Sequence, residues 1–141
     1  MQGDTFTIAE YIVDTCIKFK NDVDEIKPVC LLFGGETTVH VTGNGVGGRN
    51  QHLALQSAIL IQNIPGITIL SAGTDGNDGP TDIAGAVVDS DTVAGAILQK
   101  TDPQKYLTEF DSFHFFKKTG NQIITGPTMT NVMDIIVVLV W

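Results

Sequence analysis

Short apolar runs alternate with longer helical patterns along this chain, and this alternation limits the possible folds more than any other feature. In residues 7–20, apolar side chains recur every three or four positions, which predicts an amphipathic helix. The apolar run 29–33 suits a buried strand, and Gly34 and Gly35 are expected to end it. The remainder of the chain divides into strands and helices by the same criteria.

Further strands are expected at residues 37–42, 67–72, 122–125 and 134–140, and helices at 53–61, 91–99 and 103–109, while 112–118 fits either type. Strands that alternate with helices predict a single-domain α/β fold, with a layered, mixed, mostly parallel sheet and flanking helices. If strands 37–42 and 67–72 are parallel, the loops that follow them open at the same edge of the sheet, where such folds bind ligands. Arg49 and Asp75, one in each loop, would then lie on that edge.

Length and charge limit the classes of function. With 141 residues, 43% of them hydrophobic, the chain can bury one core and fits one domain better than two. Its 8 Lys and Arg residues stand against 16 Asp and Glu, and the net charge of -8 disfavours binding to nucleic acid or to an anionic membrane. Any anion that the chain binds must therefore be held by a local arrangement of donors.

Cysteine usage and the ends of the chain indicate a compartment. Cys16 and Cys30 lack C-x-x-C spacing and lie among apolar residues, so we interpret both as small core residues in a reducing compartment. The chain starts without a signal-peptide pattern, and the apolar run 135–140 is shorter than the roughly 20 residues that span a bilayer. These features predict a soluble, cytoplasmic protein.

A glycine-rich segment, residues 43–50, lies between a predicted strand and a predicted helix. Glycines allow the backbone to approach a ligand closely, so successive N–H groups can surround a phosphate or carboxylate at the start of the helix. Gly45, Gly47, Gly48 and Asn50 are therefore candidate phosphate- or substrate-binding residues. The alternative is a turn that needs glycine only for its shape.

Two nucleotide-binding motifs match this segment incompletely. Gly43, Gly45 and Gly48 satisfy G-x-G-x-x-G between a strand and a helix, but the acidic residue expected about 20 positions later is missing, and Asp75 comes too late. A Walker A loop would need Lys and then Ser or Thr, where this chain has Arg49 and Asn50. The segment favours anion binding without identifying a known nucleotide loop.

Arg49 and Asp75 are the candidate catalytic residues. Arg49 is the only arginine of the chain, and its planar guanidinium can bind a carboxylate or phosphate in a two-pronged fashion. The alternative is an arginine bound to a carboxylate of its own domain. Asp75 directly follows a buried strand and could accept the proton of a substrate hydroxyl. Its neighbours Thr74 and Gly76 complete the candidate binding residues.

The acidic loop 75–82 does not form a recognisable metal motif. An EF-hand reading fails because Gly79 and Ala86 stand at its fifth and twelfth positions. A magnesium ion bound by one or two of Asp75, Asp78 and Asp82 beside a nucleotide phosphate stays open, although turn formation and helix capping suit Asp78 and Asp82 better. The three histidines have no metal-ligand spacing and are expected at the surface or in structural hydrogen bonds: His40, His52 and His114. No metal ligand is assigned to this chain.

Five ordered motifs resemble the signatures of one family. They are Gly34-Gly35-Glu36-Thr37-Thr38-Val39, Gly47-Gly48-Arg49-Asn50-Gln51, Ser71-Ala72-Gly73-Thr74-Asp75-Gly76, Asp78-Gly79-Pro80-Thr81-Asp82 with Ala84-Gly85-Ala86, and Thr125-Gly126-Pro127-Thr128 with Thr130-Asn131-Val132. Together they resemble the MOFRL domain, the C-terminal domain of type 2 glycerate kinases, a glycerate 2-kinase and hydroxypyruvate reductase-like family. The resemblance covers nearly the whole chain, residues 1–141.

The resemblance implies a kinase that transfers phosphate from ATP to D-glycerate with Mg²⁺. It implies an active site in the cleft between this domain and a larger, N-terminal Rossmann-like kinase domain that is absent from this chain. By resemblance, Arg49 would hold the glycerate carboxylate or the transferring phosphate, and Asp75 would orient or deprotonate the acceptor hydroxyl. Met129 and Met133 depart from the family's usual residues, so the last loop is expected to differ.

Because the family's phosphate-binding lysine belongs to the missing domain, the isolated chain is expected to have little or no kinase activity. Its partners would be the missing N-terminal kinase domain or a full-length subunit, besides D-glycerate and ATP. Two alternatives remain from other classes of function. One is a truncated, non-catalytic binding or partner domain, and the other is an NAD(P)-dependent hydroxypyruvate reductase, suggested by the glycine triplet.

Overall fold

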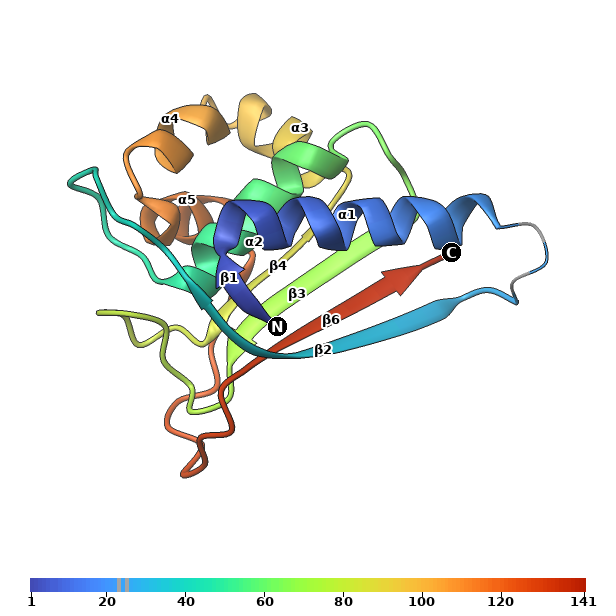
Figure 1. Ribbon diagram of the computed structural model, residues 1–141. Helices are drawn as coiled ribbons and strands as arrows, with labels where there is room; N and C mark the ends of the chain where they lie inside the picture. The colour runs from blue at the N-terminus through green and yellow to red at the C-terminus, as the bar shows by residue number, and fades with distance from the viewer. Residues whose placement is uncertain (23, 25) are drawn as a thin grey trace.

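A six-stranded sheet forms the centre of the computed structural model, which describes residues 1–22, 24 and 26–141 (Figure 1). The strand order in the sheet is β1-β2-β6-β3-β4-β5. The strands are β1 (Gln2–Asp4), β2 (Val29–Thr38), β3 (Ile67–Gly73), β4 (Gly85–Asp89), β5 (Gln122–Ile123) and β6 (Asp134–Val140). The last strand of the chain therefore lies inside the sheet, between β2 and β3.

The sheet is mixed, as expected, but the prediction that it is mostly parallel was wrong. Among the described strands, only β1 and β2 pair in parallel, and the pairs β2–β6, β3–β6, β3–β4 and β4–β5 are antiparallel. The physical reason is the position of β6. β2 and β3 run in the same direction, as two strands joined through a helix do, but β6 separates them and runs against both.

Because β2 and β3 run in the same direction, their carboxyl ends meet at one edge of the sheet, where β6 begins. We call this edge the rim. Asp134, the first residue of β6, pairs with Gly35 of β2 on one side and with Gly73 of β3 on the other. The loops that carry Arg49 and Asp75 both leave the sheet at the rim, so the expected shared edge is found despite the incorrect strand order.

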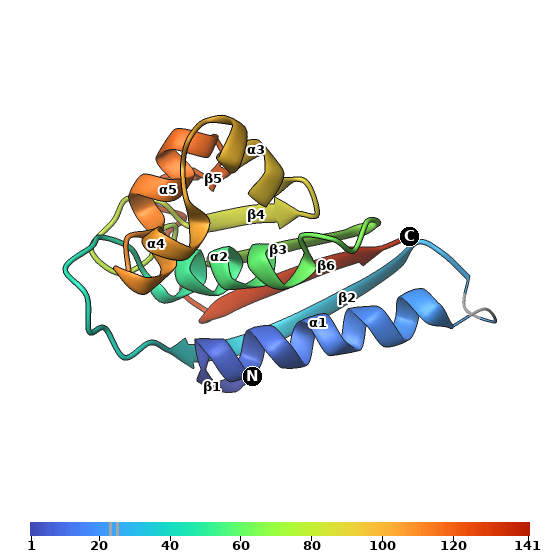
Figure 2. The ribbon, with the colours of Figure 1, turned by 90° about the horizontal axis from the view of Figure 1, so that it is seen from above.

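Five helices are present in the described part of the chain, and they lie on one side of the sheet (Figures 1 and 2). They are α1 (Thr5–Asn21), α2 (Arg49–Ile61), α3 (Thr92–Leu98), α4 (Pro103–Thr108) and α5 (Ser112–Thr119). α1 and α2 pack against the sheet and each other, whereas α3, α4 and α5 pack against α2 and one another. None of the described helices has the length and apolar composition that a membrane crossing requires, and the cytoplasmic location stays a prediction.

The hydrophobic core lies between the helices and the upper face of the sheet in Figure 1. α2 is apolar nearly all round and was expected to be buried, and its apolar residues Leu53, Ala54 and Leu55 are indeed fully buried. On α5, Phe115 and Phe116 are equally buried and contact each other edge to face. These aromatic residues explain why the ambiguous segment 112–118 is a helix: its apolar side chains complete the core against α2.

The predicted strand 29–33 and the start of the predicted strand 37–42 belong to one longer strand in the structure, and two further strands were not predicted. Gly34 and Gly35 do not end a strand, because β2 continues through them to Thr38, and residues 39–42 are not a strand. Gly35 lies against the backbone of Met1, where a side chain would collide, so the glycine permits a close approach instead of a turn. β1 and β4 were not predicted, and both are short strands whose pairing depends on residues distant in sequence.

The two cysteines occupy different environments. Cys16 of α1 is buried, and burial raises the pKa of its thiol to about 11. Cys30 of β2 is exposed, so the interpretation of both cysteines as core residues holds for Cys16 only. Both thiols are free.

Candidate functional site: an arginine held at the rim of the sheet

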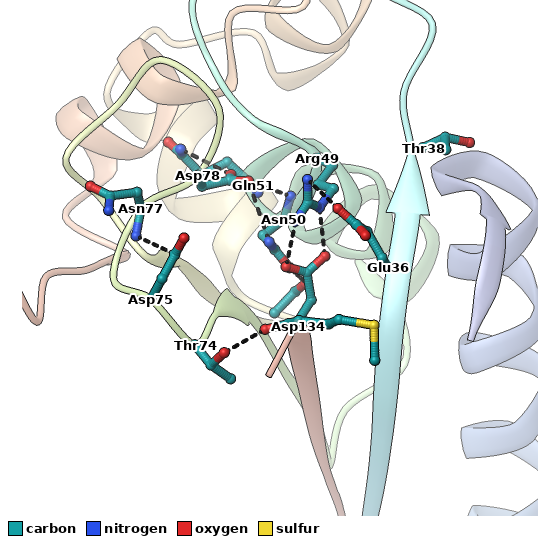
Figure 3. Close-up of polar contacts among 12 residues, drawn as sticks. Glu36, Thr38, Arg49, Asn50, Gln51, Thr74, Asp75, Asn77, Asp78 and Asp134 are labelled. Carbon is teal, nitrogen blue, oxygen red and sulfur yellow. Dashed lines mark hydrogen bonds and ion pairs between the residues drawn. The ribbon is translucent and has the colours of Figure 1, made fainter. Parts of the chain in front are cut away.

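Arg49 is the first residue of α2, directly after Gly48 at the start of the helix, and its side chain reaches the rim (Figure 3). Its Nε donates a hydrogen bond to Oδ2 of Asp134 at 2.6 Å, and its Nη2 donates to Oδ1 of the same carboxylate at 3.0 Å. Its Nη1 forms an ion pair with Oε1 of Glu36 at 3.1 Å. The guanidinium therefore lies between one carboxylate from β6 and one from β2.

The two carboxylates differ in burial. Asp134 is 5% exposed and forms a two-pronged pair with one side of the guanidinium, which fixes its orientation. Glu36 is 53% exposed, so its contact with Nη1 is easily exchanged for water or another anion. The hydrogen bonds that Arg49 donates to Asp134 are the main cause of a raised pKa at Arg49, which keeps the guanidinium charged. Arg49 is thus bound to a carboxylate of its own domain, the alternative weighed from the sequence, while its outer N–H groups remain at the surface.

A cleft of about 720 Å³ opens beside this arginine. It is lined by Gln2, Gly3, Glu36, Thr37, Thr38, Val39, Val41, Gly47, Gly48, Arg49, Gly79 and Pro80. Arg49 is the only cationic side chain among these residues. Of the candidate binding glycines, Gly47 and Gly48 line the cleft and Gly45 does not.

The glycine-rich segment is held by the turn between α4 and α5 and by the start of α5 instead of surrounding an open space. The N–H of Gly45 donates to the carbonyl of Glu109 at 2.8 Å, and the N–H of Val46 donates to the Asp111 carboxylate at 2.9 Å. A side chain at Gly45 would collide with Asp111, and one at Gly47 would collide with Ser112. Glycine is therefore required here by the close packing of protein segments, which is the shape-based alternative considered for this loop.

The start of α2 already holds an anion, the carboxylate of Asp78. This side chain is 2% exposed and accepts hydrogen bonds from the backbone N–H of Asn50 at 3.0 Å and of Gln51 at 2.8 Å, and from both side-chain amides. Burial raises the pKa of the Asp78 carboxyl, and these four hydrogen bonds act against that rise. Asp78 caps the helix from a distant loop, in line with the capping role that we favoured for it.

Asn50 contributes to this internal network and does not line the cleft. It is 2% exposed, and its Oδ1 accepts a hydrogen bond from Ser71 of β3 at 2.7 Å. Its donors are directed to Asp78. The residue therefore joins β3, α2 and the acidic loop, and a phosphate at the first N–H groups of α2 would have to displace Asp78.

Asp75 lies on the rim but is not paired with Arg49 (Figure 3). Its Oδ1 accepts from the backbone N–H of Asn77 at 3.0 Å, and its Oδ2 accepts from Nδ2 of Asn131 at 3.5 Å. In the close-up, Asp75 and Glu36 lie on opposite sides of Asp134. The two candidate catalytic residues thus share an edge of the sheet, while the cleft beside Arg49 does not include Asp75.

Thr74 and Gly76 lie on either side of Asp75 and hold its loop against the loop that precedes β6. The hydroxyl of Thr74 donates to the carbonyl of Met133 at 2.7 Å and accepts from the N–H of Val132 at 2.9 Å. Gly76 has φ +92° and lies against the carbonyl of Gly126, so no other residue fits without strain. Both residues fix the loop that carries Asp75, and neither lines the cleft of Arg49.

Within residues 1–22, 24 and 26–141, no group of three or more His, Cys, Asp or Glu side chains is arranged to hold a metal ion. Asp78 is used in the helix cap, and Asp82 is exposed. His52 is buried and stacks on Phe110 with ring centroids 4.8 Å apart. His40 and His114 are exposed, and His114 contacts Asp111.

Asp134 and Glu36 were not singled out from the sequence. Asp134 is the only charged residue in the otherwise apolar strand Asp134–Val140, and a lone carboxylate at the start of an apolar strand is a signal that could have identified it. In the sequence, Glu36 stands out only as a member of one of the five family motifs. For both residues, the pairing with Arg49 depends on a fold that places distant segments together.

The sequence pattern of the MOFRL family matches residues 29–134. The chain belongs to the MOFRL family. The match includes Glu36, Arg49, Asp75 and Asp134, the charged residues of the rim described above. Family membership confirms the resemblance inferred from the five motifs.

Named relatives of this MOFRL chain are glycerate kinases. The D-glycerate 2-kinase of Thermotoga maritima is 53% identical over 124 residues, which cover 88% of this chain and 30% of the relative. The human glycerate kinase is 44% identical over 114 residues, which cover 76% of this chain and 22% of the relative. A crystal structure of glycerate kinase from Thermotoga maritima superposes with a TM-score of 0.95 at 46% identity, over 100% of this chain and 34% of that one.

The chain therefore spans about a third or less of the length of these relatives, and it corresponds to their C-terminal part. The similarity to the crystal structure supports the α/β fold with its mixed sheet. The division into this domain and an absent N-terminal kinase domain stays a prediction, as do the roles of the individual site residues.

Proposed function

We propose that this chain is the C-terminal domain of a glycerate kinase that transfers phosphate from ATP to D-glycerate, and that it supplies one wall of an active site completed by an N-terminal domain. Membership of the MOFRL family and the names of the relatives support the reaction class. The observation that carries the proposal is the Arg49 guanidinium, oriented by the buried Asp134 at an open rim beside a cleft.

The guanidinium has donors left for a substrate. Asp134 uses Nε and one N–H of Nη2, so the outer edge formed by Nη1 and Nη2 can still bind a second anion in a two-pronged fashion. Glu36 contacts Nη1 in the free protein and is exposed enough to move away. We infer that the glycerate carboxylate or the transferring phosphate replaces Glu36 there, beside Gly47 and Gly48. Catalysis of phosphoryl transfer rests mainly on such positioning and charge neutralisation.

Asp75 is the proposed partner of the acceptor hydroxyl. It is half-buried on the same rim, and its backbone hydrogen bond from Asn77 holds the carboxylate in place. A carboxylate held in this way can orient a hydroxyl and accept its proton during phosphoryl transfer. Thr74 and Gly76 would act through the position of this loop.

The described residues give little support for a complete Mg²⁺–ATP site on this chain. Among them no three or more His, Cys, Asp or Glu side chains are arranged around a metal ion, the start of α2 is taken by Asp78, and the cleft has one cationic side chain. We therefore assign Mg²⁺ and most contacts with ATP to the N-terminal domain, and we derive no step through the metal on this chain. It follows that the isolated chain should have little or no kinase activity.

Calorimetry with D-glycerate tests the role of Arg49. The 141-residue chain should bind D-glycerate weakly, Arg49→Ala should abolish the binding heat, and Arg49→Lys should weaken it because lysine lacks the planar fork. Lys18→Ala, on α1 and distant from the rim, is the matched loss of one positive charge and should bind as the unmodified chain does. Equal binding by the unmodified chain and Arg49→Ala would remove the basis of the proposal.

A coupled assay of ADP release tests the dependence on a second domain. The purified chain with ATP, Mg²⁺ and D-glycerate should show no turnover above background. Ordinary turnover would refute the assignment of the ATP site to another domain.

A non-catalytic partner domain is the second candidate function, because the cleft beside Arg49 does not include Asp75, the other candidate catalytic residue. Such a domain would keep the fold without binding D-glycerate, so the calorimetry distinguishes the two. The reductase alternative gains no support from the geometry, since the glycine segment is packed against the turn between α4 and α5 and Asp78 occupies the start of α2. NADH fluorescence should not change when the protein is added.

A further inference from the structure

The face of the sheet opposite the helices, which is the underside in Figure 1, carries neighbouring apolar residues from four strands. Leu32, Val137, Leu70 and Val87 are paired in register from β2 across β6 and β3 to β4, and paired residues point to the same side of a sheet. Ile135 and Leu139 flank Val137 on β6 and are each 38% exposed, while Leu32 is 67% exposed. We call these six residues the open face.

This composition is unusual for a sheet surface in water. An antiparallel sheet with one solvated face normally alternates apolar and polar residues, and a strand that is apolar on both sides is typical of a sheet covered on both faces. β6 reads Asp-Ile-Ile-Val-Val-Leu-Val, with apolar residues on the core side and on the open face. In the described part of the chain, the helices contact only the other face. A contiguous apolar patch of this kind marks a contact surface.

We propose that the open face is the surface on which the N-terminal part of a glycerate kinase polypeptide packs, as the third layer of the fold. This inference rests on the proposed function, because it concerns the domain that the function requires. The D-glycerate 2-kinase of Thermotoga maritima has 70% of its length outside the matched part, by subtraction of the 30% covered. In α/β folds that have helices on both faces of the sheet, the second layer of helices buries such an apolar surface.

The position of Met1 supports this occupant. The N–H of Glu36 donates to the carbonyl of Met1 at 2.9 Å, and the amino group of Met1 contacts the carbonyl of Gly34. A polypeptide joined to Met1, as in the longer relatives, therefore reaches the sheet beside β2, next to both the open face and the rim. A layer on the open face would bring the N-terminal domain to the cleft of Arg49.

A second copy of the chain is a weaker occupant. Two copies would each bring a net charge of -8 to the contact, and Glu36 and Asp89 lie at the margins of the same face. Such repulsion opposes self-association. The chain should therefore remain monomeric in sedimentation experiments at physiological salt.

Cys30 provides a direct probe, since it pairs with Leu139 and its thiol is exposed and free. In the isolated chain, a thiol reagent should label Cys30 rapidly. In a chimera in which this chain replaces the C-terminal part of the Thermotoga maritima enzyme, labelling of Cys30, followed on its peptide by mass spectrometry, should slow at least tenfold. Leu32→Glu in the chimera should restore rapid labelling, whereas Leu98→Glu, at an 86% exposed apolar residue of α3, should leave the protection intact.

Arg49→Ala in the chimera separates this inference from the proposed function. It should abolish kinase activity and leave Cys30 protected. Rapid labelling in an active chimera would overturn the docking surface while leaving the proposed function in place. Protection of Cys30 in the isolated chain, together with a dimer in sedimentation, would assign the face to a second copy and equally overturn the proposal.

A measurement without fusion guards against a misfolded chimera. The N-terminal part of the Thermotoga maritima enzyme is produced separately and added to this chain. In the positive control, the same N-terminal part is added to the C-terminal part of the Thermotoga maritima enzyme. If the N-terminal part binds in this control, it should also bind this chain and protect Cys30, and it should fail to bind the Leu32→Glu variant of this chain. Capture of the control with no protection of Cys30 would contradict the proposal.

Discussion

At the scale of single residues, Arg49 contacts two carboxylates that should contribute very unequally to stability. Asp134→Asn removes the buried charge and leaves an amide group opposite a guanidinium, so we expect the free energy of unfolding to fall by about 2 kcal/mol. Glu36→Gln changes an exposed ion pair and should cost less than about 0.5 kcal/mol. Urea unfolding of both variants measures the difference, and equal losses would show that Asp134 does not fix the arginine.

His52 predicts a pH dependence of folding. Burial lowers the pKa of this side chain below its ordinary 6.5, and Asp4 acts in the opposite direction. The folded state therefore keeps His52 neutral, while the unfolded chain takes up a proton below pH 6.5. The stability contribution is complete above that pH and is lost as the pH falls towards the lowered pKa, by at most about 1.4 kcal/mol per pH unit.

The measurement compares urea midpoints at pH 7.5 and pH 5.5. His52→Phe keeps the stacking on Phe110 and removes the titration, so its midpoint should change less between the two pH values than that of the unmodified chain. His40→Gln, at an exposed site, should retain the full dependence. An unchanged slope in His52→Phe would assign the effect to other groups.

The residue types in the sequence were enough to predict one part of the candidate site, Arg49, but not its partners. A lone arginine beside a glycine segment was enough to select Arg49, because a unique charged residue at a helix start is visible in the sequence. Its partner Asp134 was not predicted, since it is 85 positions away and no local pattern connects the two. Asn50 was selected for its place in the motif, but its burial could not be predicted before the position of Asp78 was known.

At the scale of elements, α2 depends on a cap from another loop. Asp78→Ala would leave the buried N–H groups of Asn50 and Gln51 without acceptors, and we expect a loss of about 3 kcal/mol in the free energy of unfolding. Asp82→Ala, in the same loop but exposed, should change it by less than about 0.5 kcal/mol. Thermal unfolding of the pair tests this, and a mild effect of Asp78→Ala would mean that water can replace the cap.

Helices were predicted better than strands, for a physical reason. A helix is stabilised along its own sequence, and the periodicity of residues 7–20 and the proline that opens residues 103–109 reveal α1 and α4. A strand is stabilised by its neighbours. β4 pairs with β3 and β5, and β2 continues through Gly34 and Gly35 because β6 and Met1 support it from both sides.

At the scale of the whole molecule, β6 joins the two parts of the sheet. It pairs seven residues with β2 and seven with β3. A chain that ends at Met133 should therefore lose its cooperative unfolding transition and its near-ultraviolet circular dichroism, because the sheet would be divided. Removal of Trp141 alone should preserve both, and a cooperative transition in the shorter chain would contradict the central role of β6.

The order of the strands was the part of the fold that the sequence did not reveal. Alternation of strands and helices correctly indicated an α/β domain, and it correctly placed the loops of Arg49 and Asp75 at one edge. It could not show that the last strand enters between β2 and β3, since the apolar pattern of residues 134–140 fits any interior position. Because β6 lies between β2 and β3 and runs against both, those strand pairs are antiparallel instead of parallel. The same position of β6 places Asp134 beside Arg49.

The place of β6 in the sheet has a consequence for biosynthesis. Translation releases the polypeptide from its amino end at about 5–20 residues per second, so β2 and β3 leave the ribosome well before the segment that must lie between them. Until residues 134–140 have followed, β2 and β3 each present an unpaired edge, which is prone to wrong pairing with other chains. A nascent chain stalled before these residues would be a client for chaperones, because β6 is the strand that pairs with both edges.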